Sequence, residues 1–123
     1  MSALARARDA LSSAVSSTGL ACEPYPPDST IAPSAWIDSI SVDYANGAAF
    51  CGPGDGEAVI IAVGQRNDRA GSLSSLEGSI PAIVLALEDI DGVRVSTIQS
   101  GSADVGGQTL PAVLFTVTFH LAS

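Results

Sequence analysis

The segment from Glu23 to Ile37 contains four of the seven prolines of this 123-residue chain. Proline lacks a backbone N–H, holds its own φ nearly fixed and restricts the residue before it. Pro24, Pro26 and Pro27 therefore exclude both a helix interior and a central strand from this segment. The sequence predicts a stiff, extended crossover that turns at Pro27-Asp28-Ser29 and leads from an N-terminal helix into a sheet.

Residues 2–18, before the crossover, are predicted to form a helix. Apolar residues recur there at helical spacing, and Gly19 follows as a stop signal; they are Leu4, Ala7, Leu11, Ala14 and Val15. The stripe is narrow because alanines occupy its middle, which suits packing on a sheet.

The first half of the chain also predicts three strands. Leu20–Glu23 fits a short strand, and Ala35–Val42 follows the last proline of the crossover. Glu57–Val63 is an apolar, β-branched run that is typical of a strand buried on both faces. Between the last two strands, the glycine-rich Ala45–Gly56 has no periodicity and is predicted to be a flexible loop.

A second helical region is expected to open at Asn67-Asp68. Its apolar residues are spaced by three or four; they are Leu73, Leu76, Ile80, Ile83, Val84 and Leu87. Gly78 and Pro81 interrupt this pattern, so we expect either a kink or two helices, with Ser79 capping the second. The acidic pair Glu88-Asp89 indicates that the helix ends there, since the helix dipole disfavours acids at a C-terminus.

The remainder predicts a hairpin with a long loop. Val93–Ser100 has the pattern of a strand, Gly101–Thr109 that of a loop, and Ala112–Leu121 alternates clearly between apolar and mixed residues. The element order favours an α+β fold in one domain spanning residues 1–123. It would have a single antiparallel or mixed sheet of four to five strands, with both helical segments on one face.

The charge balance is one-sided, with 13 acids, five arginines, no lysine and a formal net charge of −8. Such a chain has no cluster of basic residues that would bind phosphate, and it should repel nucleic acid. No secretory signal and no run of 18 apolar residues is found, so no membrane contact is expected. Cys22 and Cys51 are expected to stay free thiols in a reducing cytoplasm.

The sequence offers little for chemistry, and we expect no catalytic site, no cofactor and no metal. His120 is the only histidine, and no nucleophile elbow accompanies it. Gly52–Gly56 opens a strand instead of a helix and lacks the lysine of a phosphate loop. Glu88, Asp89 and Asp91 lack calcium-loop spacing.

Three motifs carry a family resemblance: Tyr25-Pro-Pro-Asp-Ser29, Val63-Gly-Gln-Arg-Asn-Asp-Arg-Ala70 and Asp91-Gly-Val-Arg-Val95. Their order resembles that of the tail terminator proteins of long-tailed phages (siphoviruses) that infect actinobacteria. The resemblance implies a structural virion protein of the tail and neck, assembled in the host cytoplasm. A hexameric ring would cap the head-proximal end of the tail tube and end its polymerisation. It would also join the tail to the head–tail connector, with DNA passing through its lumen.

Within such a ring, four residues are our candidates for assembly contacts: Phe50, Asp55, Arg66 and Arg69. Phe50 either anchors the loop 45–56 on a neighbour or folds back on its own domain. Arg66 and Arg69 either belong to the chemistry of a helix N-terminus or meet an acid of a neighbouring subunit. The loop Gly101–Thr109 is a second candidate for reaching a neighbour or the tube.

Two other functions stay open at this point. A head-completion or stopper protein of the neck has the same size and symmetry. A small acidic ligand-binding domain is the alternative from a different class, and it requires a pocket with convergent polar groups.

Overall fold

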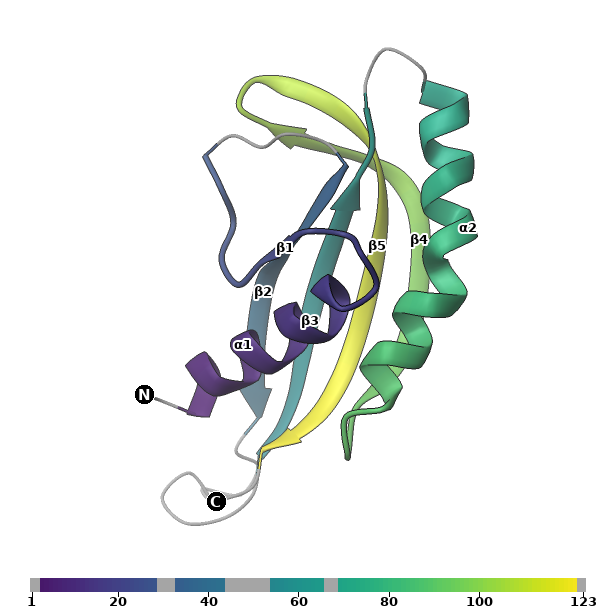
Figure 1. The fold of residues 1–123 in the computed structure, drawn as a ribbon. Coiled ribbons are helices and arrows are strands. Elements are labelled where there is room, and N and C mark those ends of the chain that lie inside the picture. The colour runs from purple at the N-terminus through teal and green to yellow at the C-terminus, as the bar shows by residue number, and fades with distance from the viewer. Residues whose placement is uncertain (1–2, 29–32, 44–53, 66–68, 122–123) are drawn as a thin grey trace.

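The computed structural model describes residues 3–28, 33–43, 54–65 and 69–121. Two helices and five strands follow one another as α1 (Ala3–Ser16), β1 (Cys22–Glu23), β2 (Ser34–Asp43), β3 (Gly54–Val63), α2 (Arg69–Glu88), β4 (Arg94–Val105) and β5 (Gln108–Leu121). The strands form one sheet in the order β1-β2-β3-β5-β4 (Figure 1). β1 and β2 are parallel and all other neighbours are antiparallel, which confirms the predicted α+β fold with a mixed sheet.

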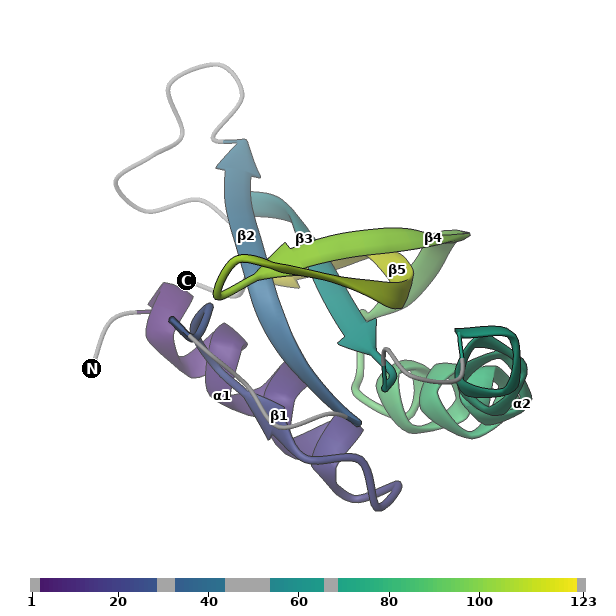
Figure 2. The ribbon, with the colours of Figure 1, turned by 90° about the horizontal axis from the view of Figure 1, so that it is seen from above.

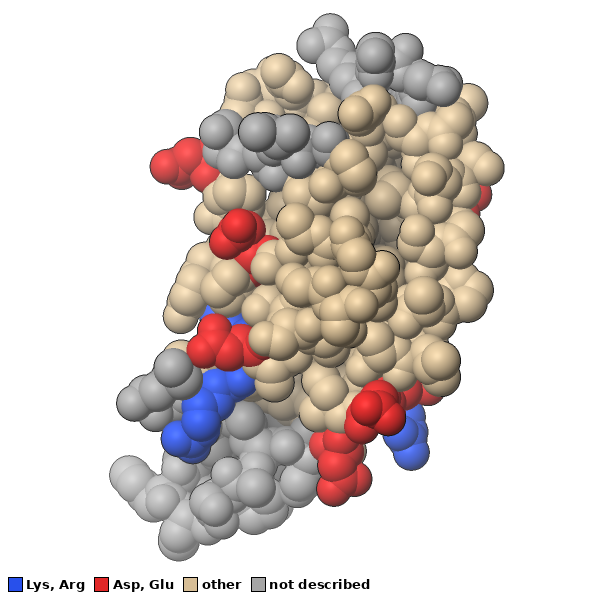
Figure 3. Space-filling model, viewed as in Figure 1, with Lys and Arg blue, Asp and Glu red and all other residues tan. Residues whose placement is uncertain are grey.

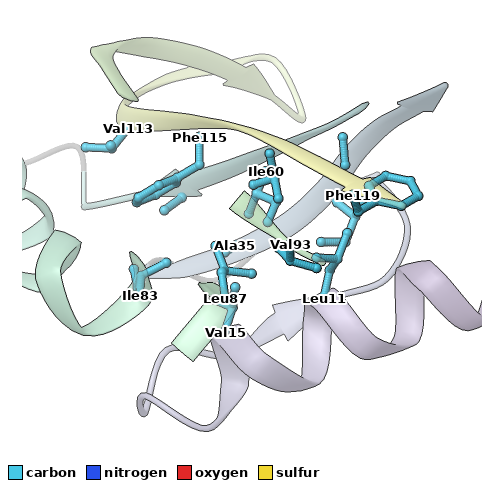
Figure 4. Packing of buried hydrophobic residues seen from close by; sticks show 14 of the residues in the cluster. Leu11, Val15, Ala35, Ile60, Ile83, Leu87, Val93, Val113, Phe115 and Phe119 are labelled. Atoms are coloured by element: carbon cyan, nitrogen blue, oxygen red, sulfur yellow. The ribbon is translucent and has the colours of Figure 1, made fainter. Parts of the chain in front are cut away.

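Both helices cover the same face of the sheet (Figures 1 and 2). Inward side chains of α1 and α2 meet alternate residues of the central strands in one apolar cluster (Figure 4). Its members include Leu11, Val15, Ala35, Ile37, Ala58, Ile60, Leu76, Ile83, Leu87, Val113, Phe115, Val117 and Phe119. The predicted helical stripes and the alternation along β5 therefore define the core.

The first helix ends as its glycine predicts. α1 stops at Ser16, and Gly19 adopts a φ of 99°, the left-handed conformation that ends many helices. The amide of Gly19 donates to the carbonyl of Ser16 at 3.0 Å. This turn directs the chain back along the sheet into β1.

Arg8 of α1 fastens the proline crossover to the sheet. Its guanidinium donates to the Pro24 carbonyl at 2.7 Å and to the Ile37 carbonyl at 3.0 Å, and it lies 4.5 Å from the ring centroid of Tyr25. Ile37 precedes a bulge in β2, where Asp38 is the extra residue before Ser39. One side chain thus connects α1, the crossover and the bulge.

The prediction of a loop over Gly101–Thr109 is wrong. β4 and β5 continue to Val105 and Gln108, and only Gly106-Gly107 separates them. Both glycines have positive φ, 57° and 81°, as a two-residue hairpin turn requires. Polar residues at positions 100–104 gave no strand pattern, because β4 is an edge strand that is exposed along most of its length.

The tip of this hairpin curls over the second face of the sheet (Figure 2). There Val105 and Leu110 bury themselves against Trp36 of β2 and Val63 of β3, together with Ala112. β3 therefore has an apolar cluster on each side at this end, as the prediction of a strand buried on both faces requires.

The start of β3 corrects another prediction. Gly54, Asp55 and Gly56 were assigned to the flexible loop, yet all three pair with β2 or β5. A Cβ at Gly56 would overlap the ring of Phe119. This glycine is therefore a strand residue that makes room for an aromatic ring, and its presence does not mark a loop.

The second helical region is a single helix. α2 runs from Arg69 to Glu88 through both Gly78 and Pro81, so the two-helix alternative is wrong. Ser79 does not cap a helix; its hydroxyl donates to the carbonyl of Ser75, one turn earlier, at 3.2 Å. Leu76 and Ile83 hold the helix to the core on both sides of Pro81, and this packing offsets the unfavourable proline.

Candidate assembly surfaces

Of the four predicted interface residues, the structure describes only Asp55 and Arg69, and it places these two far apart. Phe50 and Arg66 lie outside the described residues, and of Asp55 and Arg69 only the backbone is described. Asp55 pairs with Asp43 and His120 near the start of β3. Arg69 begins α2, which follows the other end of β3. Two assembly contacts through these residues would therefore involve opposite ends of the molecule.

The outer face of α2 is the most unusual surface among the described residues. The stretch Ala70–Glu88 has a mean hydropathy of 1.4, yet only 17% of it is buried. Leu85 is 75% exposed, and Pro81 and Ala82 beside it are exposed too. The second half of α2 therefore exposes an apolar patch formed by Pro81, Ala82 and Leu85, whereas Ser74, Ser75 and Glu77 are exposed in its first half.

The carboxylates of α2 are turned away from that face. Glu77 accepts a hydrogen bond from the Ser100 hydroxyl at 2.8 Å, and Glu88 accepts one from the Val95 amide at 3.1 Å. Both contacts tie α2 to β4. A broad uncharged area over α2 is left in a chain of net charge −8 (Figure 3).

By length and composition alone, α2 would also be able to cross a membrane. Serines and glycines interrupt its apolar residues, so a search for one unbroken apolar run did not detect it. However, Leu76, Ile83 and Leu87 belong to the core that α2 shares with the sheet. Insertion into a bilayer would remove them from that core, and we therefore interpret the outer face as a surface for protein contact.

β4 continues the uncharged surface along the edge of the sheet. No charged residue lies between Arg94 and Asp104, and Ile98 in the middle is 40% exposed. Among the strands of the described residues, β4 has a neighbour on one side only, which is β5. Natural edge strands usually carry charges or prolines that prevent further pairing, and this stretch has neither.

An open groove of about 690 Å³ lies between the end of α1 and the first half of α2. Small and hydroxyl-bearing residues line it, and none of its lining residues is charged. Two of the hydroxyls, on Thr18 and Ser79, donate to carbonyls of their own helices. Gln65, Ser72 and Ser75 also line the groove, so its polar side chains are all uncharged.

The Cys22 thiol is not built for nucleophilic chemistry. Burial, and secondly the nearby Glu23 carboxylate, raise its pKa from 9.0 to about 12. The thiol is thus protonated at neutral pH, where it is a poor nucleophile. The pKa of this thiol is higher in the folded chain than in the unfolded chain. The stability that depends on its protonation is therefore constant below pH 9 and is lost as the pH rises toward 12.

Within the described ranges, no three His, Cys, Asp or Glu side chains gather in a way that would hold a metal ion. His120 is paired with Asp55 through the backbone of β5, as predicted for a strand residue. Sequence reasoning missed the outer face of α2 and the edge of β4. The signal for α2 was present, because residues 70–86 contain a single charged residue, Glu77.

No protein-family model matches this chain, and no curated protein matches it.

Proposed function

We propose that this protein is a structural component of a phage virion that assembles as a hexameric ring at the head-proximal end of the tail tube. The ring ends tube polymerisation and joins the tail to the head–tail connector, and DNA passes through its lumen. The observation that carries an assembly role is the exposed apolar face of α2 in an otherwise acidic chain. The choice of this particular assembly rests on the resemblance of the three sequence motifs to tail terminators.

The charge of the chain is compatible with passage of DNA. Six copies at −8 each give a ring of −48 (6 × −8). Acidic residues that line a lumen repel the phosphate backbone, so DNA would slide without sticking. Binding of double-stranded DNA to the protein, measured across a range of salt concentrations, tests this point. Tight binding that weakens steeply with salt would contradict it.

Electron microscopy of particles assembled without this protein tests the proposed function. We expect tails of excessive and variable length, because nothing ends the polymerisation of the tube. Supplying the wild-type protein in trans should restore a uniform length. Empty or leaking heads without tails would instead favour the head-completion or stopper role, and normal particles would refute both.

Phe50 stays a predicted anchor in this assembly. If the side chain of Phe50 binds a neighbouring subunit or the tail tube, a Phe50→Ala protein should cap tails poorly. Normal tail length with the variant would show that Phe50 serves its own domain.

A further inference from the structure

The exposed apolar residues lie on two opposite sides of the molecule. Leu85 of α2 and Ile98 of β4 belong to one side, and Leu4 of α1 and Tyr25 of the crossover to the other. The sheet order places β4 at one edge and β1 with β2 at the other. Contact between two different surfaces of one chain is what a closed ring requires.

The second edge of the sheet is only partly covered. β1 pairs with β2 at Ala35 and Trp36 alone. From Ile37 to Asp43, no strand of the described part of the chain lies on the outer side of β2. The Ile37 carbonyl already accepts a hydrogen bond from Arg8, and Asp38 is the bulge residue. The sheet therefore presents two edges with strand backbone available for pairing: all of β4, and β2 from Ser39 to Asp43.

The two edge strands overlap in register across the sheet, and they run antiparallel to each other. Following the register across the sheet, Arg94 of β4 aligns through β5 and β3 with Ser41 of β2, and Ile98 aligns with Ile37. Three successive antiparallel pairings make β4 antiparallel to β2. Copies placed side by side at the same height would thus bring the first half of β4 against the open half of β2.

We propose that β4 of one copy pairs antiparallel with the outer edge of β2 in the next copy, extending the sheet from subunit to subunit. This inference rests on the proposed ring and names the surfaces that build it. α1 covers β2 on the same face on which α2 covers β4 and β5. The pairing therefore places the outer face of α2, with Leu85, beside α1 of the neighbour, with Leu4.

Charge favours a second copy as the occupant of this edge. Two copies each carry −8 and repel one another wherever acids face acids. The stretch Val95–Ala103 contains no charged residue, and Glu77 and Glu88 of α2 are hydrogen-bonded to Ser100 and Val95 of β4. The opposing edge of β2 carries Asp38 and Asp43, which therefore meet an uncharged strand of the next copy and no row of acids.

Disulfide trapping tests the pairing. Thr97 and Ser39 are exposed and align across the sheet, and opposed residues of antiparallel strands lie within disulfide reach. Full-length T97C and S39C chains, each also carrying Cys22→Ala and Cys51→Ser, are mixed and oxidised, both alone and with purified tail tubes. We expect a mixed T97C–S39C dimer, and a ladder up to six chains from the double variant.

Three results would overturn the pairing: no mixed dimer under either condition, T97C homodimers, or S39C homodimers. T97C homodimers would indicate two-fold pairing of β4 with itself. A mixed dimer together with normal tails in particles lacking the protein would instead refute the proposed function and leave the pairing intact. Overlong tails without a mixed dimer would support the proposed function and refute the pairing.

A charge on the edge gives an independent measurement. Ile98→Lys should reduce the mixed disulfide by about tenfold or more, since lysine on an edge strand opposes further pairing. Gln108→Lys adds the same charge at the exposed tip of the hairpin and should leave the yield unchanged. Circular dichroism and the urea midpoint establish that both variants fold. An unchanged yield with Ile98→Lys would contradict the inference.

Discussion

α1 and α2 lie on the same face of one sheet, yet their outward surfaces differ. α1 buries Leu11 and Val15 and turns polar residues such as Asp9 and Ser13 to the outside. α2 buries Leu76, Ile83 and Leu87 and exposes Pro81, Ala82 and Leu85. The inner stripes follow the same physics, because each covers apolar strands. The outward surface of α1 is thus mostly polar, with Leu4 as its exposed apolar residue, whereas α2 exposes an apolar patch suited to contact with another protein.

Truncating the inner stripes should have the largest effect and should be similar for both helices. Leu11 and Leu87 are 2% and 0% exposed. Leu11→Ala and Leu87→Ala should each lower the free energy of unfolding by about 2 to 5 kcal/mol, through lost burial and a residual cavity. Urea unfolding followed by circular dichroism measures this. Leu85→Ala is the control and should change little. A negligible loss with Leu11→Ala would show that α1 is not part of the core.

Removing the contacts that Arg8 of α1 makes should have the next largest effect on stability. Arg8→Met removes two charge-assisted hydrogen bonds and leaves the carbonyls of Pro24 and Ile37 without this donor. We expect a loss of about 1.5 to 3 kcal/mol in the free energy of unfolding. Arg6→Met removes the same charge but neither of these hydrogen bonds, so its loss should be smaller. Equal losses would mean that net charge matters and the crossover contact does not.

Pro81 tests whether α2 is continuous. Proline in a helix interior is about 3 kcal/mol less favourable than alanine, partly offset by its effect on the unfolded chain. Pro81→Ala should therefore raise the free energy of unfolding by about 2 kcal/mol, as denaturant titration would show. The neighbouring exposed Ala82→Gly should lower it by about 1 kcal/mol. If neither substitution changed stability, the helix would not continue through this point.

The outer faces should show the smallest effect on stability and the clearest difference in surface character. Leu85→Glu and Ser13→Glu should each alter the free energy of unfolding by less than about 0.5 kcal/mol, because both positions are exposed. Retention on a hydrophobic-interaction column should fall for Leu85→Glu and stay nearly constant for Ser13→Glu. Equal shifts would mean that the two outward surfaces are alike.

Sequence periodicity predicted the element order well and the connections poorly. The helices, the short first strand and the alternating last strand all follow from local spacing. Gly54–Gly56 and Gly101–Ala103 were misassigned because glycine, alanine and serine carry no periodic signal. Their strand conformation depends on partners in β5, such as Ala112 for Gly101 and Leu121 for Gly54, which no local pattern identifies. The interface candidates Phe50 and Asp55 came from the glycine-rich loop, and Arg66 and Arg69 from a local concentration of positive charge. No described contact joins them.

By itself, the sequence determined the type and order of the helices and strands, because hydrophobic spacing, prolines and Gly19 act within a few residues. It also determined the acidic charge and the apolar character of residues 70–86. The tertiary structure decided that Pro81 stays inside one helix and that the β4–β5 hairpin curls over Trp36. It also decided that Arg8 fastens the crossover and that Leu85 faces outward. These outcomes depend on contacts between residues far apart in the chain, whose packing outweighs local preference.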